Sequence, residues 1–157
     1  MGTSMRLAIS ISVLLAAGCA GEAPQKHSPP VEKSALAAKG DALYRALGGQ
    51  DGIAKVVDAA LAEIHGDLRI NLFFEKTDMA DLRRLLIEQI CEASGGPCKY
   101  SGRSMEEAHS GLNLTDADFD AFVQDLVSAM DSQKVPKDLQ KQLLDVFGPM
   151  KPQVVGQ

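Results

Sequence analysis

From about residue 34 onward, apolar side chains recur every three or four residues, the spacing that places them on one face of an α-helix. Glycine and proline interrupt this pattern at Gly48-Gly49, at Gly66 and at Gly95-Gly96-Pro97, where a helix would have to end. Only 4% of the residues are aromatic and tryptophan is absent, which disfavours an all-β architecture. The sequence therefore predicts an all-α fold.

The size and charge of the chain narrow the function classes. With 157 residues, 45% of them hydrophobic and 24% charged, the chain fits one globular domain with a short extension. The formal net charge is -5, and the 16 basic residues are scattered along the sequence. A nucleic-acid binder usually concentrates basic residues on one face, so nucleic acid is not an expected partner.

Residues that favour helix N-termini mark where the helices should begin. A first helix is expected to end at Leu47. We expect Asp51 to cap the second helix, and Asp78 to cap the third. Thr115 should cap a long fourth helix, and Pro136 suits the first position of the last one.

The N-terminus has the layout of a secretory signal. Arg6 is followed by an apolar run of about a dozen residues and then by small residues, a stretch too short to span a bilayer comfortably. Residues 15–18 (LAAG) lead directly into Cys19 and resemble the lipobox of bacterial lipoproteins. We expect residues 1–18 to be a lipoprotein signal peptide, and residues 19–40 to carry a lipidated Cys19 and a flexible tether. The alternative is an ordinary signal peptide followed by an accidental cysteine.

The residue after Cys19 indicates a destination. Ala20, rather than aspartate, resembles the pattern that directs lipoproteins to the outer membrane of Gram-negative bacteria. The expected location is therefore outside the cytoplasm, on a membrane reached through the lipid on Cys19, at the periplasmic face of the outer membrane.

Two further cysteines lie in the predicted globular part. Cys91 and Cys98 are separated by the end of the third helix and a Gly-Gly-Pro turn. Because an exported pair of cysteines usually oxidises, we expect a disulfide between them. A cysteine nucleophile paired with His109 is the alternative, and it is disfavoured because Cys91 falls within a helix.

Five motifs occur in one order along the chain. They are LYRALGG at residues 43–49, the Phe73-Phe74 pair, the Gly-Gly-Pro loop with Tyr100 and Gly102, MEEAHSGL at residues 105–112, and VPKDLQKQLLDVFGPM from Val135. Together they resemble the truncated haemoglobins, specifically group 1, over about residues 41–155. The resemblance implies a truncated globin domain at residues 41–157, with helices packed two over two around haem b.

The resemblance also implies which residues hold the haem. His109 is the expected proximal ligand of the haem iron, since a neutral imidazole facing an apolar slot is the usual globin solution. His27 falls in the tether and His65 at the end of a helix, so neither fits this role. The expected haem contacts are Phe73, Phe74, Leu82, Leu86, Met105, His109, Leu114, Phe119, Phe122 and Leu126.

The opposite, distal side departs from the family pattern. Many relatives place Tyr on the second helix and Gln on the third, but the matching positions here are Leu61, Leu82 and Leu86. Gln89 is the one polar candidate nearby. We therefore expect a pocket that holds O₂ loosely. The family's usual basic residue for a haem propionate is replaced by Leu85, and the candidates that could substitute are Arg83, Arg84, Lys99 and Arg103.

The expected function is reversible binding of O₂ and other diatomic gases (CO, NO), of the oxygen-carrier type. No catalytic residue is expected. One alternative is a haem redox enzyme or sensor, for NO detoxification or peroxidase-like turnover, served by an unidentified reductase. The other is a helical lipoprotein that keeps the fold as an interaction module without haem.

Overall fold

The computed structural model describes residues 40–157, so the predicted signal peptide, Cys19 and nearly all of the tether lie outside the described residues. Within this range every regular element is a helix, which confirms the predicted all-α class. No helix in this range is long and apolar enough to cross a membrane. The elements are α1 (Ala42–Ala46), α2 (Gly49–Gly66), η2 (Asn71–Phe74), α3 (Met79–Ala93), α4 (Met105–His109), α5 (Asp116–Ser132), α6 (Lys137–Phe147) and η3 (Gly148–Gln153).

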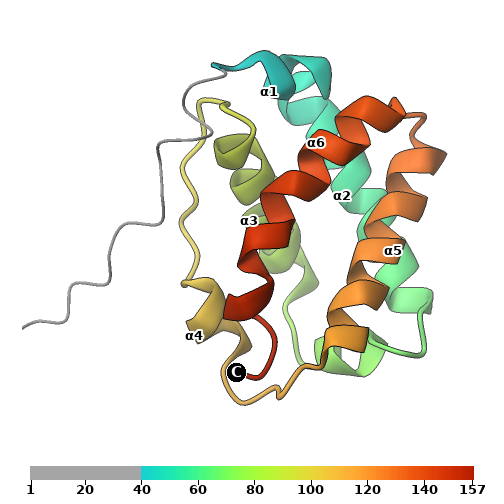
Figure 1. Ribbon diagram of the computed structural model, residues 1–157, viewed down its shortest axis with the longest axis vertical. Helices are drawn as coiled ribbons and strands as arrows, with labels where there is room; N and C mark the ends of the chain where they lie inside the picture. Colours follow the sequence, from blue (N-terminus) through green and yellow to red (C-terminus); the bar gives the residue numbers. More distant parts are fainter. Residues whose placement is uncertain (1–39) are drawn as a thin grey trace, which may run out of the picture. The chain divides into compact units, whose positions relative to one another are not determined.

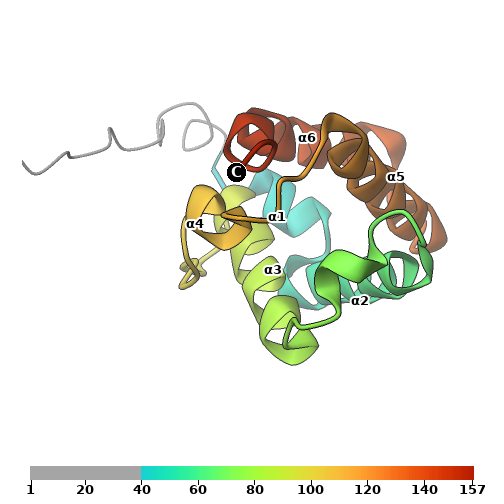
Figure 2. The ribbon, with the colours of Figure 1, turned by 90° about the horizontal axis from the view of Figure 1, so that it is seen from below.

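The four longer helices form two layers (Figure 1). Seen from below, α2 and α3 lie on one side, and α5 and α6 on the other (Figure 2). The long helix α2 packs against both α3 and α5, so it joins the two layers. Its apolar stripe supplies Ile53 and Val57 to the core, where they meet Met130 of α5 and Leu143 of α6, all at most 1% exposed. The arrangement is the predicted two-over-two sandwich.

Two helix starts are capped as the sequence predicts. The side chain of Asp78 accepts hydrogen bonds from the backbone N–H groups of Ala80 and Asp81, which would otherwise lack partners at the start of α3. Thr115 and Asp118 form a reciprocal capping box at the start of α5. Local side-chain chemistry thus fixes where both helices begin.

Two other starts differ from the prediction. Helix α2 begins at Gly49, with Gly48 as its N-cap at φ 88°, because glycine adopts this left-handed conformation without strain. Asp51 lies in the first turn instead of capping it, where its charge suits the positive end of the helix dipole. Pro136 is the N-cap of α6, and its carbonyl accepts the first hydrogen bonds of the helix.

One acidic side chain is buried in α5 near the end of α2. Asp125 is 8% exposed, and its Oδ2 atom is buried without a hydrogen-bond partner. Its Oδ1 atom lies 3.9 Å from a guanidinium nitrogen of Arg69. Burial raises the pKa of Asp125, the negative charge of Asp67 raises it further, and Arg69 opposes the change. Folding therefore favours the protonated carboxyl.

Asp125→Asn is expected to stabilise the fold at neutral pH. A raised pKa contributes stability below the ordinary value of 3.8, and this stability is lost as the pH rises through the pKa of the folded state. The neutral amide of asparagine does not carry this loss of stability. The midpoint temperature of thermal unfolding at pH 7 should therefore rise by roughly a few degrees. The gain should disappear near pH 3. Asp138→Asn, at an exposed position in α6, is the control, and equal shifts in both variants would contradict the explanation.

Candidate functional site

A cavity of about 450 Å³ is lined by residues from η2, α3, α4 and α5 and from the segments around them. This volume lies in the range of small-molecule and cofactor sites. Its wall is mainly apolar and includes most of the contacts expected from the sequence. These are Phe73, Phe74, Leu82, Leu86, Gln89, Met105, His109, Leu114, Phe119 and Phe122.

Two expected pocket residues do not line the cavity. Leu126 is 3% exposed and belongs to the main core cluster, because it lies one turn beyond Phe122 on α5. Leu61 packs against both clusters of buried residues, and Ile64 is the α2 residue that reaches the cavity instead. Leu61, expected as the roof of the pocket, is therefore not among the residues that line this cavity.

Several lining residues were not expected. Ile64 and Phe147 are buried residues of the amphipathic helices α2 and α6, and the helical spacing of apolar residues does not reveal their place in the cavity wall. Met150 and Val154 come from the chain after α6, which has no helical period to reveal them. Lys76 also lines the cavity, and it precedes Asp78, the cap of α3.

His109 is the last residue of the five-residue helix α4. Ser104 and Glu107 form a capping box that begins this helix. The Nδ1 atom of His109 lies 2.7 Å from the backbone carbonyl oxygen of Met105. A carbonyl only accepts hydrogen bonds, so Nδ1 carries the proton in the neutral ring, and the lone pair is on Nε2. This tautomer is the one that binds a metal through Nε2.

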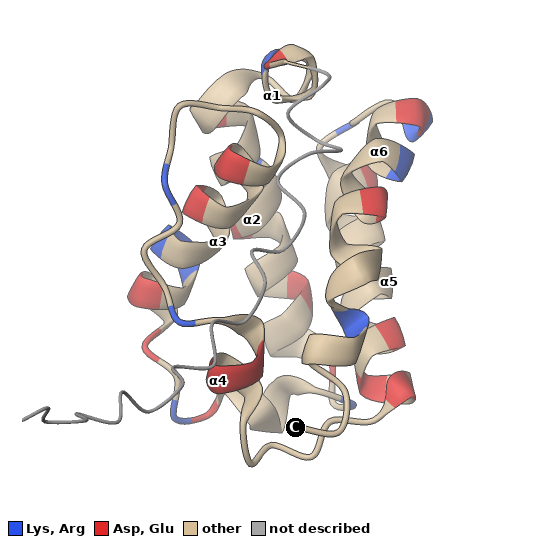
Figure 3. Ribbon diagram, turned by 60° about the vertical axis from the view of Figure 1, so that its left-hand side comes forward, with Lys and Arg blue, Asp and Glu red and all other residues tan. Residues whose placement is uncertain are grey.

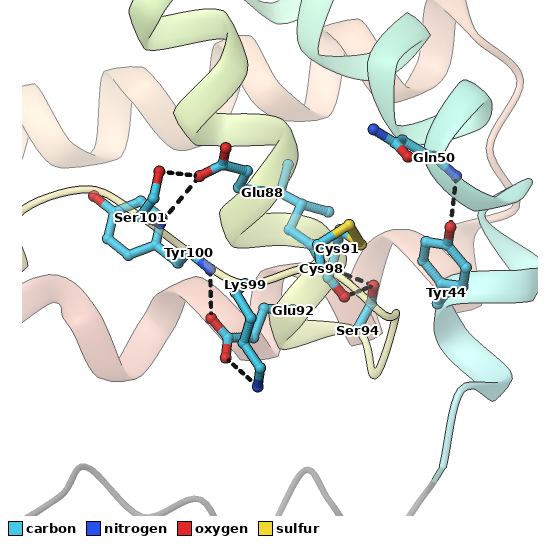
Figure 4. Close-up of a disulfide and its surroundings, with 11 residues drawn as sticks. Tyr44, Gln50, Glu88, Cys91, Glu92, Ser94, Cys98, Lys99, Tyr100 and Ser101 are labelled. Atoms are coloured by element: carbon cyan, nitrogen blue, oxygen red, sulfur yellow. Dashed lines mark hydrogen bonds and ion pairs between the residues drawn. A yellow bond between two sulfur atoms is a disulfide. The ribbon is translucent and has the colours of Figure 1, made fainter.

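The loop before α4 is tied to α3. A disulfide joins Cys91 of α3 to Cys98 of the loop, with 5.7 Å between their Cα atoms (Figure 4). The carboxylate of Glu92 accepts a hydrogen bond of 2.8 Å from the backbone N–H of Tyr100. The carboxylate of Glu88 accepts hydrogen bonds from the backbone and the hydroxyl of Ser101. These ties fix the course of the chain that leads to His109.

Gly96 permits the close approach of the loop to α3. A Cβ atom at this position would lie 2.7 Å from the Sγ atom of Cys91 and 2.6 Å from the ring of Tyr44. Both distances are far below normal contact, so the turn beside the disulfide requires glycine. Packing thus explains Gly96, whereas Gly95, at φ 87°, has the left-handed conformation that glycine adopts without strain.

Two basic residues line the cavity, Lys76 and Arg103. In the described part of the chain Lys76 makes no ion pair, and Arg103 donates only to the backbone carbonyl of Glu107, at 3.4 Å. Figure 3 shows the basic positions of the loop before α4, and the acidic first turns of α4 and α5. The other three expected cations do not line the cavity and are paired with carboxylates: Arg83 with Asp58, Arg84 with Asp81 and Glu88, and Lys99 with Glu92. Of these carboxylates, Asp81 lines the cavity.

Tyr100 and Gln89 add polar atoms to the cavity wall. Burial raises the pKa of Tyr100, so its phenol stays neutral, and it donates a hydrogen bond of 2.9 Å to the carbonyl oxygen of Arg103. The side-chain nitrogen of Gln89 contacts the sulfur atoms of Met105 and Met150, at 3.5 and 3.4 Å. The donor groups of both side chains are thus directed at neighbouring residues of the cavity wall.

Comparison with known sequences gives a consistent set of relatives. The profile of a family described as bacterial-like globin matches residues 42–155. A group 1 truncated haemoglobin of Nostoc sp. (strain MUN 8820) is 38% identical over 109 residues, which are 69% of this chain and 92% of the relative. A group 1 truncated haemoglobin of Synechocystis sp. is 36% identical over 110 residues, 68% of this chain and 89% of that protein.

Solved structures agree with the sequence relatives. The truncated haemoglobin of Tetrahymena pyriformis in its Fe(III) form matches with a TM-score of 0.71 and 27% identity, over 73% of this chain and 98% of that one. The 2/2 haemoglobin of Synechococcus sp. PCC 7002, solved in the cyanomet state with covalently attached haem, matches with a TM-score of 0.69 and 30% identity. That match covers 73% of this chain and 98% of the other.

Proposed function

This chain belongs to the bacterial-like globin family, as a group 1 truncated haemoglobin, and we propose that it binds haem b and reversibly binds diatomic gases such as O₂, CO and NO. The observation that carries the proposal is the tautomer of His109 and its place in the cavity wall. Its Nδ1 proton is held by the carbonyl of Met105, and the residue lines an apolar cavity of about 450 Å³. A neutral imidazole in such a cavity is the donor that a haem iron requires.

The residues of the cavity fit haem as a whole. Phe73, Phe74 and Phe119 offer aromatic surface to a flat apolar ring, and His109 offers one nitrogen ligand. Lys76 and Arg103 can neutralise the two propionates, because neither is committed to a carboxylate in the described part of the chain. Bound haem would supply an iron with one open position for a diatomic gas.

The chain's own residues set the environment of that gas. Leu82 and Leu86 line the cavity, and they offer no hydrogen-bond donor. The amide nitrogen of Gln89 is directed at two sulfur atoms. This lack of a free donor supports fast, reversible exchange of gases over retention of a polar ligand.

A haem titration tests the proposal. Adding haemin to the purified haem-free chain should produce an intense Soret absorption band that saturates at one haem per chain. Reduction followed by CO should then shift the band, because the open iron position takes up the gas. A chain without haem affinity, as expected of an interaction module, would show no saturation, and this result would overturn the proposal.

We also propose that Cys19 carries lipid and holds the domain on a membrane facing the periplasm. Cys19 lies outside the described residues, and the support is the sequence before it. Two or more acyl chains suffice for stable anchoring, at about 0.8 kcal/mol per buried methylene. The wild-type protein should therefore sediment with membranes.

Cys19→Ser is expected to move the protein almost completely into the soluble fraction, as measured by fractionation and immunoblotting of the cells. The neighbouring change Ala20→Ser keeps the cysteine and should leave the protein on the membrane. If the wild-type protein is equally soluble and retains residues 1–18, the proposed processing does not occur.

A further inference from the structure

Three residues from different elements meet in one part of the cavity wall. They are Gln89 of α3, Met105 of α4 and Met150 of η3, and all three are partly buried. The Nε2 atom of Gln89 lies 3.5 Å from the sulfur of Met105 and 3.4 Å from the sulfur of Met150. One primary amide, which has two N–H donors, is thus placed between two thioethers.

This pairing is unusual in its chemistry. A thioether sulfur is a weak acceptor, whereas an amide N–H prefers oxygen. Conversion of a thioether to a sulfoxide places a strong acceptor oxygen on the sulfur, within reach of the donor that is already there. The present arrangement therefore matches the oxidised form of the two methionines better than the reduced form.

We propose that Met105 and Met150 form a paired oxidation site for hydrogen peroxide, with Gln89 donating hydrogen bonds to the sulfoxide oxygens. The sulfur lone pair attacks one peroxide oxygen, the O–O bond breaks, and an S–O bond forms. The departing hydroxide takes the proton of the transferred oxygen and leaves as water. Sulfur is oxidised by two electrons and peroxide is reduced by two, so the reaction needs no other reactant.

Oxidation would change the cavity itself. A sulfoxide is polar where the thioether was apolar, so two of the apolar side chains in the wall become hydrophilic. Met105 is also the residue whose carbonyl oxygen holds Nδ1 of His109. Peroxide would therefore act on the segment that orients the histidine, and methionine sulfoxide reductases could reverse the change.

The chain contains two internal references for a test. Met79 is partly exposed, as Met105 and Met150 are. Among the described residues, it is not one that lines the cavity. Met130 is fully buried, with 0% exposure. The full-length protein, as purified and again after haem extraction, is treated with dilute hydrogen peroxide. Peptide mass spectrometry then gives the rate of oxygen addition at each methionine.

Met105 and Met150 are expected to oxidise about two- to tenfold faster than Met79, the factor that one added hydrogen bond supplies, while Met130 stays unmodified. Gln89→Leu keeps the size of the side chain but removes the donors, and it should lower both rates to that of Met79. Equal rates at Met79 and the pair in the wild-type protein would overturn the proposal, whatever the variant does. Acceleration that requires haem and persists in Gln89→Leu would also overturn it, because the iron and not the amide would then be responsible.

Discussion

Replacing His109 with glycine is expected to lower haem affinity by about a hundredfold or more, since the variant loses the iron ligand itself and not merely a residue that orients it. No other histidine among residues 40–157 lines the cavity. Addition of imidazole should restore the Soret band, since the space left by the ring can accept the free base. Haem titration followed by absorbance, with and without imidazole, measures both effects.

His65→Gly is the matched control. His65 is exposed in the last turn of α2, so the same chemical change there should leave haem affinity unchanged. Full retention of haem with an unaltered spectrum in His109→Gly would refute the assignment of the ligand. Loss of haem in both variants would instead indicate that glycine destabilises the fold.

Leu86→Gln is expected to slow O₂ dissociation by about tenfold or more, and to change CO dissociation little. Bound O₂ is polar and accepts a hydrogen bond, which contributes about 1 to 3 kcal/mol, whereas bound CO is much less polar. Leu86 lines the cavity and Leu61 does not, so α3 is the better place for a new donor. Stopped-flow or flash-photolysis kinetics of both gases measure the difference.

Leu86→Met controls for the change in shape, because methionine has a similar volume and no donor. Its O₂ dissociation should stay close to that of the wild-type protein. If the wild-type protein already releases O₂ as slowly as Leu86→Gln, the side chain of Gln89 or an ordered water must supply a donor. The apolar description of the pocket would then be wrong.

Local signals explain why much of the fold could be predicted from the sequence. Asp78 and Thr115 cap their helices through bonds to residues two or three positions away, so nothing distant is needed to recognise them. The start of α2 was misplaced because a glycine in the left-handed conformation can begin a helix without a side-chain cap. Residue preferences alone do not decide between Gly48 and Asp51 as the N-cap of this helix.

The site was harder to predict where it depends on packing between distant segments. Leu61 and Ile64 are one turn apart on the same stripe, and only the neighbouring helices decide that Ile64 faces the cavity. Met150 reaches the wall through a short helix of the 3-10 type, which has no apolar period of its own. The family resemblance supplied His109, and the structure added its tautomer.

The shortness of α4 has a consequence for how the protein would exchange its cofactor. Five residues are too few to form a stable helix in isolation. The segment is held instead by its cap, by packing against η3, and by the preceding loop, which Cys91, Glu88 and Glu92 fasten to α3. We therefore expect the domain to open first at this segment, in the manner of a local unfolding unit, while its two layers stay folded. The lifetime of bound haem would then depend mainly on the contacts that hold α4 in place, and only secondarily on the free energy of unfolding of the whole domain.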